Sequence, residues 1–424
     1  MKRTALLAAL LILPLTSAKL FADGPAATPT LEQLWEIIQS QQEEINMLRQ
    51  QQATTEKKAT VADEKATVAD EKAEAAVVAV EESETRSASS GNWADRTTIG
   101  GYGELHYNNL EGSGGETDKK EIDLHRFVLH FGHEFTDDIR FFSEIEYEHG
   151  VAGDDQVGEV EIEQAFVEFD LNDQNTARVG VALLPVGIIN ETHEPTTFYG
   201  VERNPVEKNI IPASWWAGGV GLFGEITPGW SYDVVLHEGL KVDAFNADDN
   251  KKYAVRGGRQ KTGKADAEDL AATARVKWTG IPGTEIGATV QYQEDVTQSK
   301  DKTAGSAWLY EVHADIERGP FGLRALYAMW DLSGSGPESI GADEQEGFYI
   351  EPSWKFNDRF GVFTRFNQWD NRAGNSSKTE QQQVDVGLNW WPIEDVVLKA
   401  DYQWQDNDDD MERDGFNLGF GYVF

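Results

Sequence analysis

Titratable side chains gather in one segment, residues 184–214, which is also rich in proline and apolar residues. Carboxylate, guanidinium and imidazole groups held close together can attract or repel ions and can transfer protons. The sequence contains no Gly-x-Ser-x-Gly elbow, no plausible Ser/His/Asp cluster and no metal-binding motif. We therefore predict no enzyme, no cofactor and no bound metal, but a constriction that acts on ions through charge. Its residues are Glu191, His193, Glu194, Glu202, Arg203, Glu207 and Lys208.

A second set of charges occurs at alternate positions of otherwise apolar segments. Alternate positions of a strand face opposite sides of a sheet. Charges on such a wall must face water or pair with one another, because lipid does not solvate them. We predict that these residues line a water-filled lumen, although for any one of them an ion pair with a neighbour is the simpler alternative. They are Arg126, Arg140, Arg178, Glu144, Glu146, Arg275, Arg324 and Arg365.

Three other polar features carry weaker predictions. Acidic residues alternate from Asp406 to Glu412, but Met411 stands where a calcium-binding loop of the EF type needs glycine, so we expect no specific ion there. His193 is interpreted as a satisfied loop imidazole and not as a metal ligand. One basic run could collect anions or bind lipopolysaccharide phosphates, although a solvated outer loop is the simpler reading. Its members are Lys251, Lys252, Arg256, Arg259, Lys261 and Lys264.

The elements that position these charges are strands. From residue 93 to the end, alternating segments are separated in turn by short turns and long loops, which predicts about 16 antiparallel strands in a transmembrane barrel. Mean hydropathy of −0.50 is compatible with such strands, since only half of their residues are apolar. An even strand number puts both ends of the barrel on the side of the short turns, the periplasmic side. A soluble sandwich or propeller would not explain the alternation of short and long connections.

The last ten residues make the strongest strand. Their bulky residues take every second position, with small or polar residues between them, and the chain ends on phenylalanine. An apolar edge strand of this kind is protected when it pairs with the first strand of a barrel and faces lipid. The segment resembles the C-terminal assembly signal of bacterial outer-membrane barrels, which implies the barrel assembly machinery as a partner. The residues of this signal are Phe416, Leu418, Phe420, Tyr422 and Phe424.

The segment 184–214 is too apolar for an exposed loop, so we predict that it folds into the barrel as the third long loop. This segment resembles the corresponding region of the phosphate-selective porin O/P family. The resemblance lies in the runs Leu183-Leu184-Pro185-Val186-Gly187, Glu191-Thr192 and Glu202-Arg203. That resemblance implies a trimeric porin through which small hydrophilic solutes or ions diffuse, including anions such as phosphate or organic acids. Anion-selective members rely on lumen lysine and arginine, whereas this segment holds four acids against two bases.

The N-terminal part predicts export and oligomerisation. Residues 1–22 have the basic start, apolar run and small residues of a signal peptide, with cleavage after Ala18 or Ala22, and residues 23–30 form a short leader. Residues 31–83 keep a heptad repeat typical of a periplasmic coiled coil, as in dicarboxylate-type trimeric porins, or of a partly disordered charged linker in the alanine-rich half. Residues 84–92 form a linker. The seam begins with Leu31, Leu34, Ile38, Ile45 and Leu48.

The composition limits which partners the protein can bind. A formal charge of −37 excludes nucleic acid, which requires a basic surface. We predict a homotrimer in the bacterial outer membrane, in contact with its lipid and lipopolysaccharide. The alternative function is a structural anchor whose coil tethers the membrane to peptidoglycan, and it predicts a barrel that does not conduct.

Overall fold

The structure is a computed structural model that describes Trp35, Gln39 and Gln42 and residues 93–150, 158–248 and 251–424. The chain divides into two compact units, Met1–Ser89 and Ser90–Phe424. In the first unit the three described residues are helical. The predicted signal peptide, leader, coiled-coil seam and linker otherwise lie outside the described residues.

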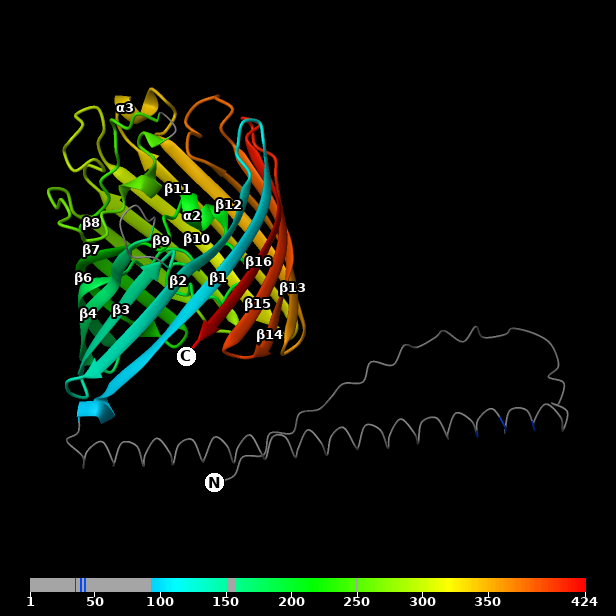
Figure 1. Cartoon of the computed structure of the whole chain (residues 1–424). Helices are drawn as coiled ribbons and strands as arrows, with labels where there is room; N and C mark the ends of the chain where they lie inside the picture. Colours follow the sequence, from blue (N-terminus) through cyan, green and yellow to red (C-terminus); the bar gives the residue numbers. More distant parts are fainter. Residues whose placement is uncertain (1–34, 36–38, 40–41, 43–92, 151–157, 249–250) are drawn as a thin grey trace, which may run out of the picture. The chain divides into compact units, whose positions relative to one another are not determined.

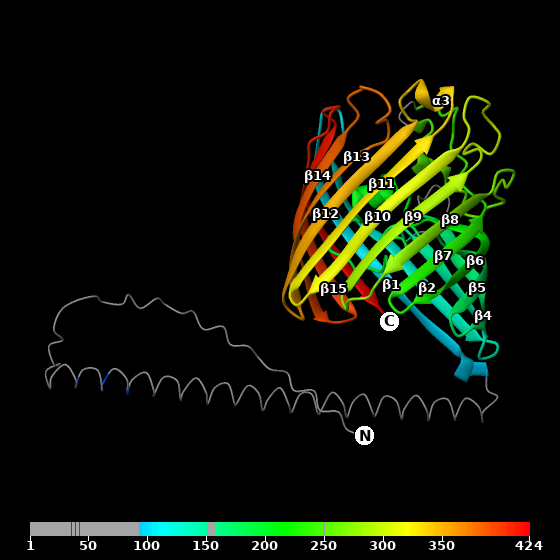
Figure 2. The same cartoon turned by 180° about the vertical axis from the view of Figure 1, so that it is seen from behind.

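The second unit is a closed barrel in which every strand pairs antiparallel with its neighbours in sequence and β16 pairs with β1 (Figures 1 and 2). The described residues form sixteen strands, which confirms the predicted transmembrane barrel. The strands are β1 (Thr97–Ser113), β2 (Lys119–Glu134), β3 (Ile139–Glu148), β4 (Val160–Asn172), β5 (Asn175–Leu183), β6 (Trp216–Thr227), β7 (Trp230–His237), β8 (Ala271–Trp278), β9 (Thr284–Gln293), β10 (Ala307–Arg318), β11 (Phe321–Leu332), β12 (Glu344–Asn357), β13 (Phe360–Asp370), β14 (Gln381–Ile393), β15 (Val396–Gln405) and β16 (Glu412–Val423).

The strands form because their apolar residues alternate with polar or small ones, and the barrel places the two sets on opposite faces. Where β16 meets β1, Phe420 lies opposite Leu105 and both are exposed on the outer surface. Further along the same two strands, the buried Asn417 lies opposite the buried Asn108, and their side-chain amides form a 2.8 Å hydrogen bond. The outer surface therefore suits lipid and the inner surface suits water.

Short turns join the strands at one end of the barrel and long loops join them at the other (Figure 1). Among the residues that the structure describes, four short helices lie in or beside these connections: η1 (Trp93–Arg96), α2 (Pro205–Asn209), η3 (Val255–Gly258) and α3 (Ser335–Glu338). No helix among the described residues is long and apolar enough to cross a bilayer.

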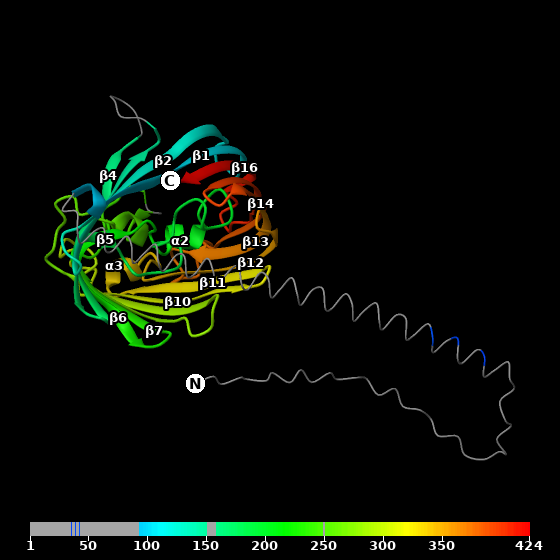
Figure 3. The ribbon, with the colours of Figure 1, turned by 90° about the horizontal axis from the view of Figure 1, so that it is seen from below.

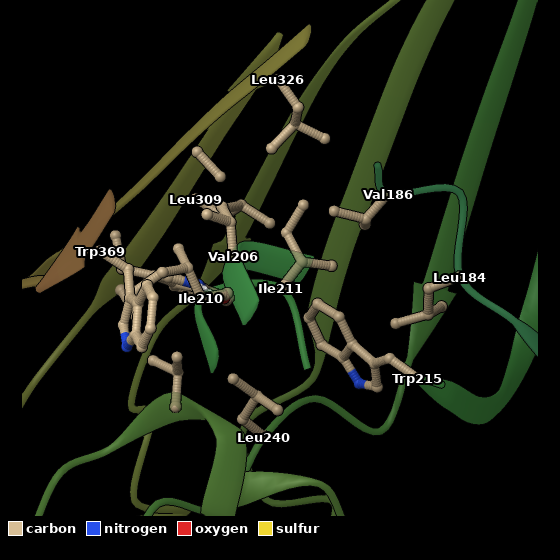
Figure 4. Close-up of a cluster of buried hydrophobic side chains, with 14 of the residues drawn as sticks. Leu184, Val186, Val206, Ile210, Ile211, Trp215, Leu240, Leu309, Leu326 and Trp369 are labelled. Carbon is tan, nitrogen blue, oxygen red and sulfur yellow. Dashed lines mark hydrogen bonds between the residues drawn. The ribbon is translucent and has the colours of Figure 1, made fainter. Parts of the chain in front are cut away.

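The apolar core lies inside the barrel, around the connection between β5 and β6. We call this connection, residues 184–215, loop 3. Viewed along the barrel, its helix α2 lies within the ring of strands (Figure 3). Val206, Ile210 and Ile211 pack there with Trp215 and with Leu309 from the wall, and all five are buried (Figure 4). The apolar residues that made this segment improbable as a surface loop are those that fill the lumen.

Candidate functional site

Loop 3 is closed at its base by one asparagine. The Asn190 side-chain amide donates to the carbonyl oxygens of Leu184 and Trp215 at 2.8 and 2.9 Å, and its oxygen accepts from the Trp215 amide at 2.6 Å. The helix α2 begins at Pro205 behind Asn204, whose side chain accepts from the Glu207 amide at 2.7 Å. Proline at the first helical position and an asparagine cap are typical helix starts. These bonds give the loop a defined shape.

Loop 3 reaches walls on several sides of the lumen. The Val201 amide donates to the Asp401 carboxylate on β15 at 2.6 Å. The Asn389 side chain on β14 donates to the Phe198 carbonyl at 3.1 Å. Trp330 on β11 also donates its indole N–H to loop 3. Backbone groups that cannot reach water inside the barrel must find such partners, so the strands hold the loop across the lumen.

Two chambers remain beside loop 3. The outer chamber, of about 530 Å³, is bounded by loop 3, by β13 to β16 and by the loops that precede β14 and β16. The inner chamber, of about 400 Å³, lies between loop 3, the wall formed by β1 to β4, and residues 238–270, which we call loop 4. Both chambers are bounded by Lys119, Glu202, Arg203 and Lys208. These four residues therefore lie where a solute would pass from one chamber to the other.

Most carboxylates around the inner chamber already have basic partners. Glu121 lies 3.3 Å from the Lys119 ammonium, and Glu202 lies 3.4 Å from His106. On β4, Glu161 pairs with Lys261 of loop 4, which also lies 2.9 Å from Glu159. Paired charges contribute little to the field felt by a solute.

Four cations at the chambers have no such partner: Arg203 and Lys208 of loop 3, and Arg256 and Arg259 of loop 4. Among the described residues, no carboxylate oxygen lies within 4.0 Å of their charged nitrogens. Arg256 instead donates to the Lys208 carbonyl, and the Arg203 guanidinium donates to the Ser214 hydroxyl at 2.7 Å. Burial and the neighbouring Arg259 lower the pKa of Arg256 to about 10. These cations repel one another, and an anion placed among them would relieve the repulsion.

The remaining predicted loop residues are spread over different surroundings. Glu191 forms an ion pair with Arg275 on β8. His193 is buried against β3 and β4, and Glu194 is half-buried. Glu207 lies in the apolar core of loop 3, where its carboxylate accepts the amides of the two isoleucines 188 and 189 at 3.0 and 2.7 Å. Loop 3 thus brings Glu202, Arg203 and Lys208 to the chambers, whereas the other four predicted residues border neither chamber.

Most of the predicted lumen residues on strands face inward and pair across the wall. Arg126 and Glu146 border the inner chamber, and Arg126 donates to the His193 carbonyl at 2.5 Å. Glu144 accepts hydrogen bonds from Tyr102 and Gln164. The other five arginines pair as follows: Arg140 with Glu168 and Asp170, Arg178 with Glu168, Arg275 with Asp233, Arg324 with Asp315, and Arg365 with Glu351 and Asp385.

Two contributions to the site were not predicted from the sequence. Arg256 and Arg259 were expected in an outer loop, whereas loop 4 folds back and brings both to the inner chamber. The basic run in an acidic chain was the available signal. The second contribution is a group of imidazoles on the β1–β3 wall, in which His106 stacks on His125 with ring centroids 4.5 Å apart. A bulge in β2 at His125 shifts the register there, and alternation alone does not reveal a bulge.

A closed sixteen-stranded barrel with an apolar outer surface, a charged interior and a loop folded into the lumen defines a class of protein, the outer-membrane porins. The family model for phosphate-selective porin O and P matches residues 98–424. The chain therefore belongs to this family, and it is an outer-membrane channel for small solutes.

The individual relatives agree with this assignment. An uncharacterized protein of Aquifex aeolicus (strain VF5) is 30% identical over 366 residues, which span 77% of this chain and 80% of the relative. The outer-membrane channel DcaP of Acinetobacter baumannii has a similar structure, with a TM-score of 0.54 and 16% identity over 77% of this chain and 97% of DcaP. The anion-selective porin from Comamonas acidovorans has a TM-score of 0.54 and 10% sequence identity, and the match covers 77% of this chain and 99% of that porin. At these identities the two structures show a shared fold.

Proposed function

We propose that this porin preferentially passes small anions, such as phosphate or small organic acids. The observation that carries the proposal is the cationic cluster formed by Arg203, Lys208, Arg256 and Arg259, for which the described residues supply no carboxylate within 4.0 Å. Arg203 and Lys208 border both chambers, so a permeating anion meets them at the passage. Most carboxylates nearby are neutralised by their own partners. A family described as phosphate-selective supports the same preference.

The cluster acts by attraction alone in this proposal. Arginine and lysine side chains replace part of the water shell that an anion loses when it enters a narrow passage. No covalent step is involved, so we expect no enzymatic activity. Attraction must stay weak enough for the anion to leave. Glu146 and Glu148 on β3 border the same chamber and, among the described residues, have no basic group within 4.0 Å, so these two carboxylates provide that limit.

We also propose that the protein is a homotrimer. The exposed tryptophans of the described strands lie on β7, β10, β12, β14 and β15, and β1 to β5 and β16 carry none. Tryptophan marks the lipid interface of membrane barrels, so the side formed by β1 to β5 and β16 is better suited to contact between protomers. The heptad repeat of residues 31–83 supports oligomerisation through a periplasmic coiled coil. Lipid, lipopolysaccharide, the barrel assembly machinery and peptidoglycan are its expected partners.

The anion preference is tested by the reversal potential in a planar bilayer under a potassium chloride gradient. The double variant Arg256→Ala/Arg259→Ala removes two unpaired charges from the chamber, and we expect its reversal potential to move toward cation preference. Lys241→Ala is the matched control, because Lys241 lies in the same loop but pairs with Asp266 at 2.8 Å and does not border either chamber. Equal reversal potentials for the wild type and the double variant would contradict the proposal.

A further inference from the structure

Three buried ligand atoms converge beneath loop 3, at the edge of the inner chamber. His193 Nε2 lies 3.4 Å from Glu163 Oε2 on β4 and 3.9 Å from Glu144 Oε1 on β3. The three residues are 3%, 1% and 2% exposed, respectively. A buried imidazole and two buried carboxylates so close together repel one another unless a proton or a cation lies among them.

The hydrogen bonds show which atoms are free. His193 Nδ1 lies 3.0 Å from the Asn190 carbonyl oxygen and must donate to it, so in the neutral ring Nε2 carries a lone pair. Within the described part of the chain, neither His193 Nε2 nor Glu163 Oε2 has a hydrogen-bond partner. Both atoms are therefore buried and unsatisfied, and they lie 3.4 Å apart.

We propose that His193, Glu163 and Glu144 bind a divalent transition-metal ion of the Zn²⁺ type and that this ion pins loop 3 to the wall formed by β3 and β4. Ligands about 2.0–2.1 Å from a tetrahedral ion lie about 3.3 Å apart. The distance from His193 Nε2 to Glu163 Oε2 is close to this value, the distance to Glu144 Oε1 is longer, and all three ligand atoms lie within 4.8 Å of one another. One imidazole and two carboxylates are ligands that zinc accepts. A histidine whose Nδ1 donates to a backbone carbonyl is oriented as metal-bound histidines are.

The fold prepares the two carboxylates for this role. Gln164 pairs with Glu144 and Ile162 pairs with Ile145, so Glu163 is the extra residue of a β-bulge. A bulge turns a side chain toward a direction that regular alternation would not give it. Glu144 is held at both oxygens: the Tyr102 hydroxyl and His130 Nε2 lie 3.1 and 3.2 Å from Oε1, and the Gln164 amide donates to Oε2 at 2.6 Å. Glu163 also borders the inner chamber, which gives an ion a route to the site.

Two neighbouring groups fit an ion less well. Asp123 accepts from His125 and His149 at 3.2 and 2.9 Å, so these side chains satisfy one another without a metal. Glu146, Glu148 and Glu161 are all carboxylates, and Glu161 already pairs with a lysine. The ligands of the proposed site are far apart in the sequence, so no local motif marks it.

The test is calorimetric titration of Zn²⁺ into the full-length porin, purified in detergent and stripped with a chelator. Glu163→Gln keeps the size of the side chain and His193→Gln keeps a hydrogen-bonding group, but each removes a ligand. The matched control is Asp123→Asn, which disrupts the other histidine group. The heat-modifiable migration of each folded barrel on a gel establishes assembly before titration.

We expect the wild type to bind one Zn²⁺ per chain, and each ligand variant to raise the Kd by more than about 100-fold, while Asp123→Asn stays within about threefold. A stripped wild type that takes up no Zn²⁺ would overturn the proposal. So would binding that survives both ligand substitutions or is lost only in Asp123→Asn. Because no current is measured, these outcomes are independent of the anion selectivity proposed above.

Discussion

The hydroxyl group of Tyr349 on β12 donates a 2.8 Å hydrogen bond to the carboxylate of Glu207 in loop 3, and both residues are buried. The same carboxylate accepts two backbone amides of the loop. Glu207 therefore connects the fold of loop 3 to the barrel wall. A charged residue of the lumen is used here to position the constriction and not to meet solute.

Replacement of Glu207 by alanine is expected to loosen loop 3. It leaves two buried amide groups and the Tyr349 hydroxyl without an acceptor, which costs roughly 3 kcal/mol or more. Tyr349→Phe removes one hydrogen bond and should cost about 1 kcal/mol. Urea unfolding in detergent measures the stability, and current noise in a bilayer reports loop motion. A Glu207→Ala variant as stable and as quiet as Tyr349→Phe would contradict this role.

Gly421 on β16 leaves room for loop 3. A Cβ atom at this position would lie 2.4 Å from Cβ of Pro195 and 3.3 Å from Val397. Gly421→Ala should therefore displace the loop, change the single-channel conductance and cost about 1–3 kcal/mol. Gly257→Ala is the control, since its Cβ would meet nothing within 4 Å. Identical conductance in both variants would show that β16 does not position the loop.

Arg126 and Arg140 face the same lumen but differ in burial. Arg126 is 1% exposed and pairs with the buried Glu104, so Arg126→Ala leaves an uncompensated charge and should cost about 3–5 kcal/mol. The Arg140 side chain is 37% exposed and its pairs are screened by water, so Arg140→Ala should cost about 1 kcal/mol or less. Urea midpoints followed by tryptophan fluorescence measure the difference, and equal midpoints would contradict it.

The C-terminal residue closes the barrel. Phe424 and Gly101 exchange backbone hydrogen bonds of 2.9 and 3.0 Å, and the Phe424 ring stacks on Phe127 with centroids 6.2 Å apart. Phe424→Ala should reduce the amount of folded barrel in the outer-membrane fraction several-fold. Phe245→Ala, in the exposed part of loop 4, is the control. Equal amounts of heat-modifiable protein would exclude a role for Phe424 in assembly.

The barrel wall could be predicted from the sequence because each strand is marked by a pattern of neighbouring residues. Alternation of bulky and small residues, as from Phe416 to Phe424, assigns each side chain to one face of a strand without knowledge of distant residues. The short turns and long loops then give the number and direction of the strands. The apolar content of residues 184–214 likewise indicated that this segment needed cover.

The site was less predictable because its geometry depends on distant contacts. Nothing near Glu207 in sequence indicates that Tyr349 holds its carboxylate within the core of loop 3. The basic run around Arg256 is unusual in an acidic chain, but it does not show that loop 4 returns to the chamber. The bulge at Glu163 shifts the register in a way that the pairing of β3 with β4 decides. The net charge of the passage therefore depends on which charged residues the fold brings to it. A count of the charges within residues 184–214 alone does not give that net charge.

The reversal potential of the wild-type protein in a planar bilayer under a potassium chloride gradient decides whether the barrel is a conducting pore whose unpaired lumen cations favour anions. We predict current that appears in groups of three steps and a reversal potential with the sign of anion preference. Folded protein that passes no current would contradict the channel and favour the structural anchor. A reversal potential with the sign of cation preference would contradict the role of Arg203, Lys208, Arg256 and Arg259.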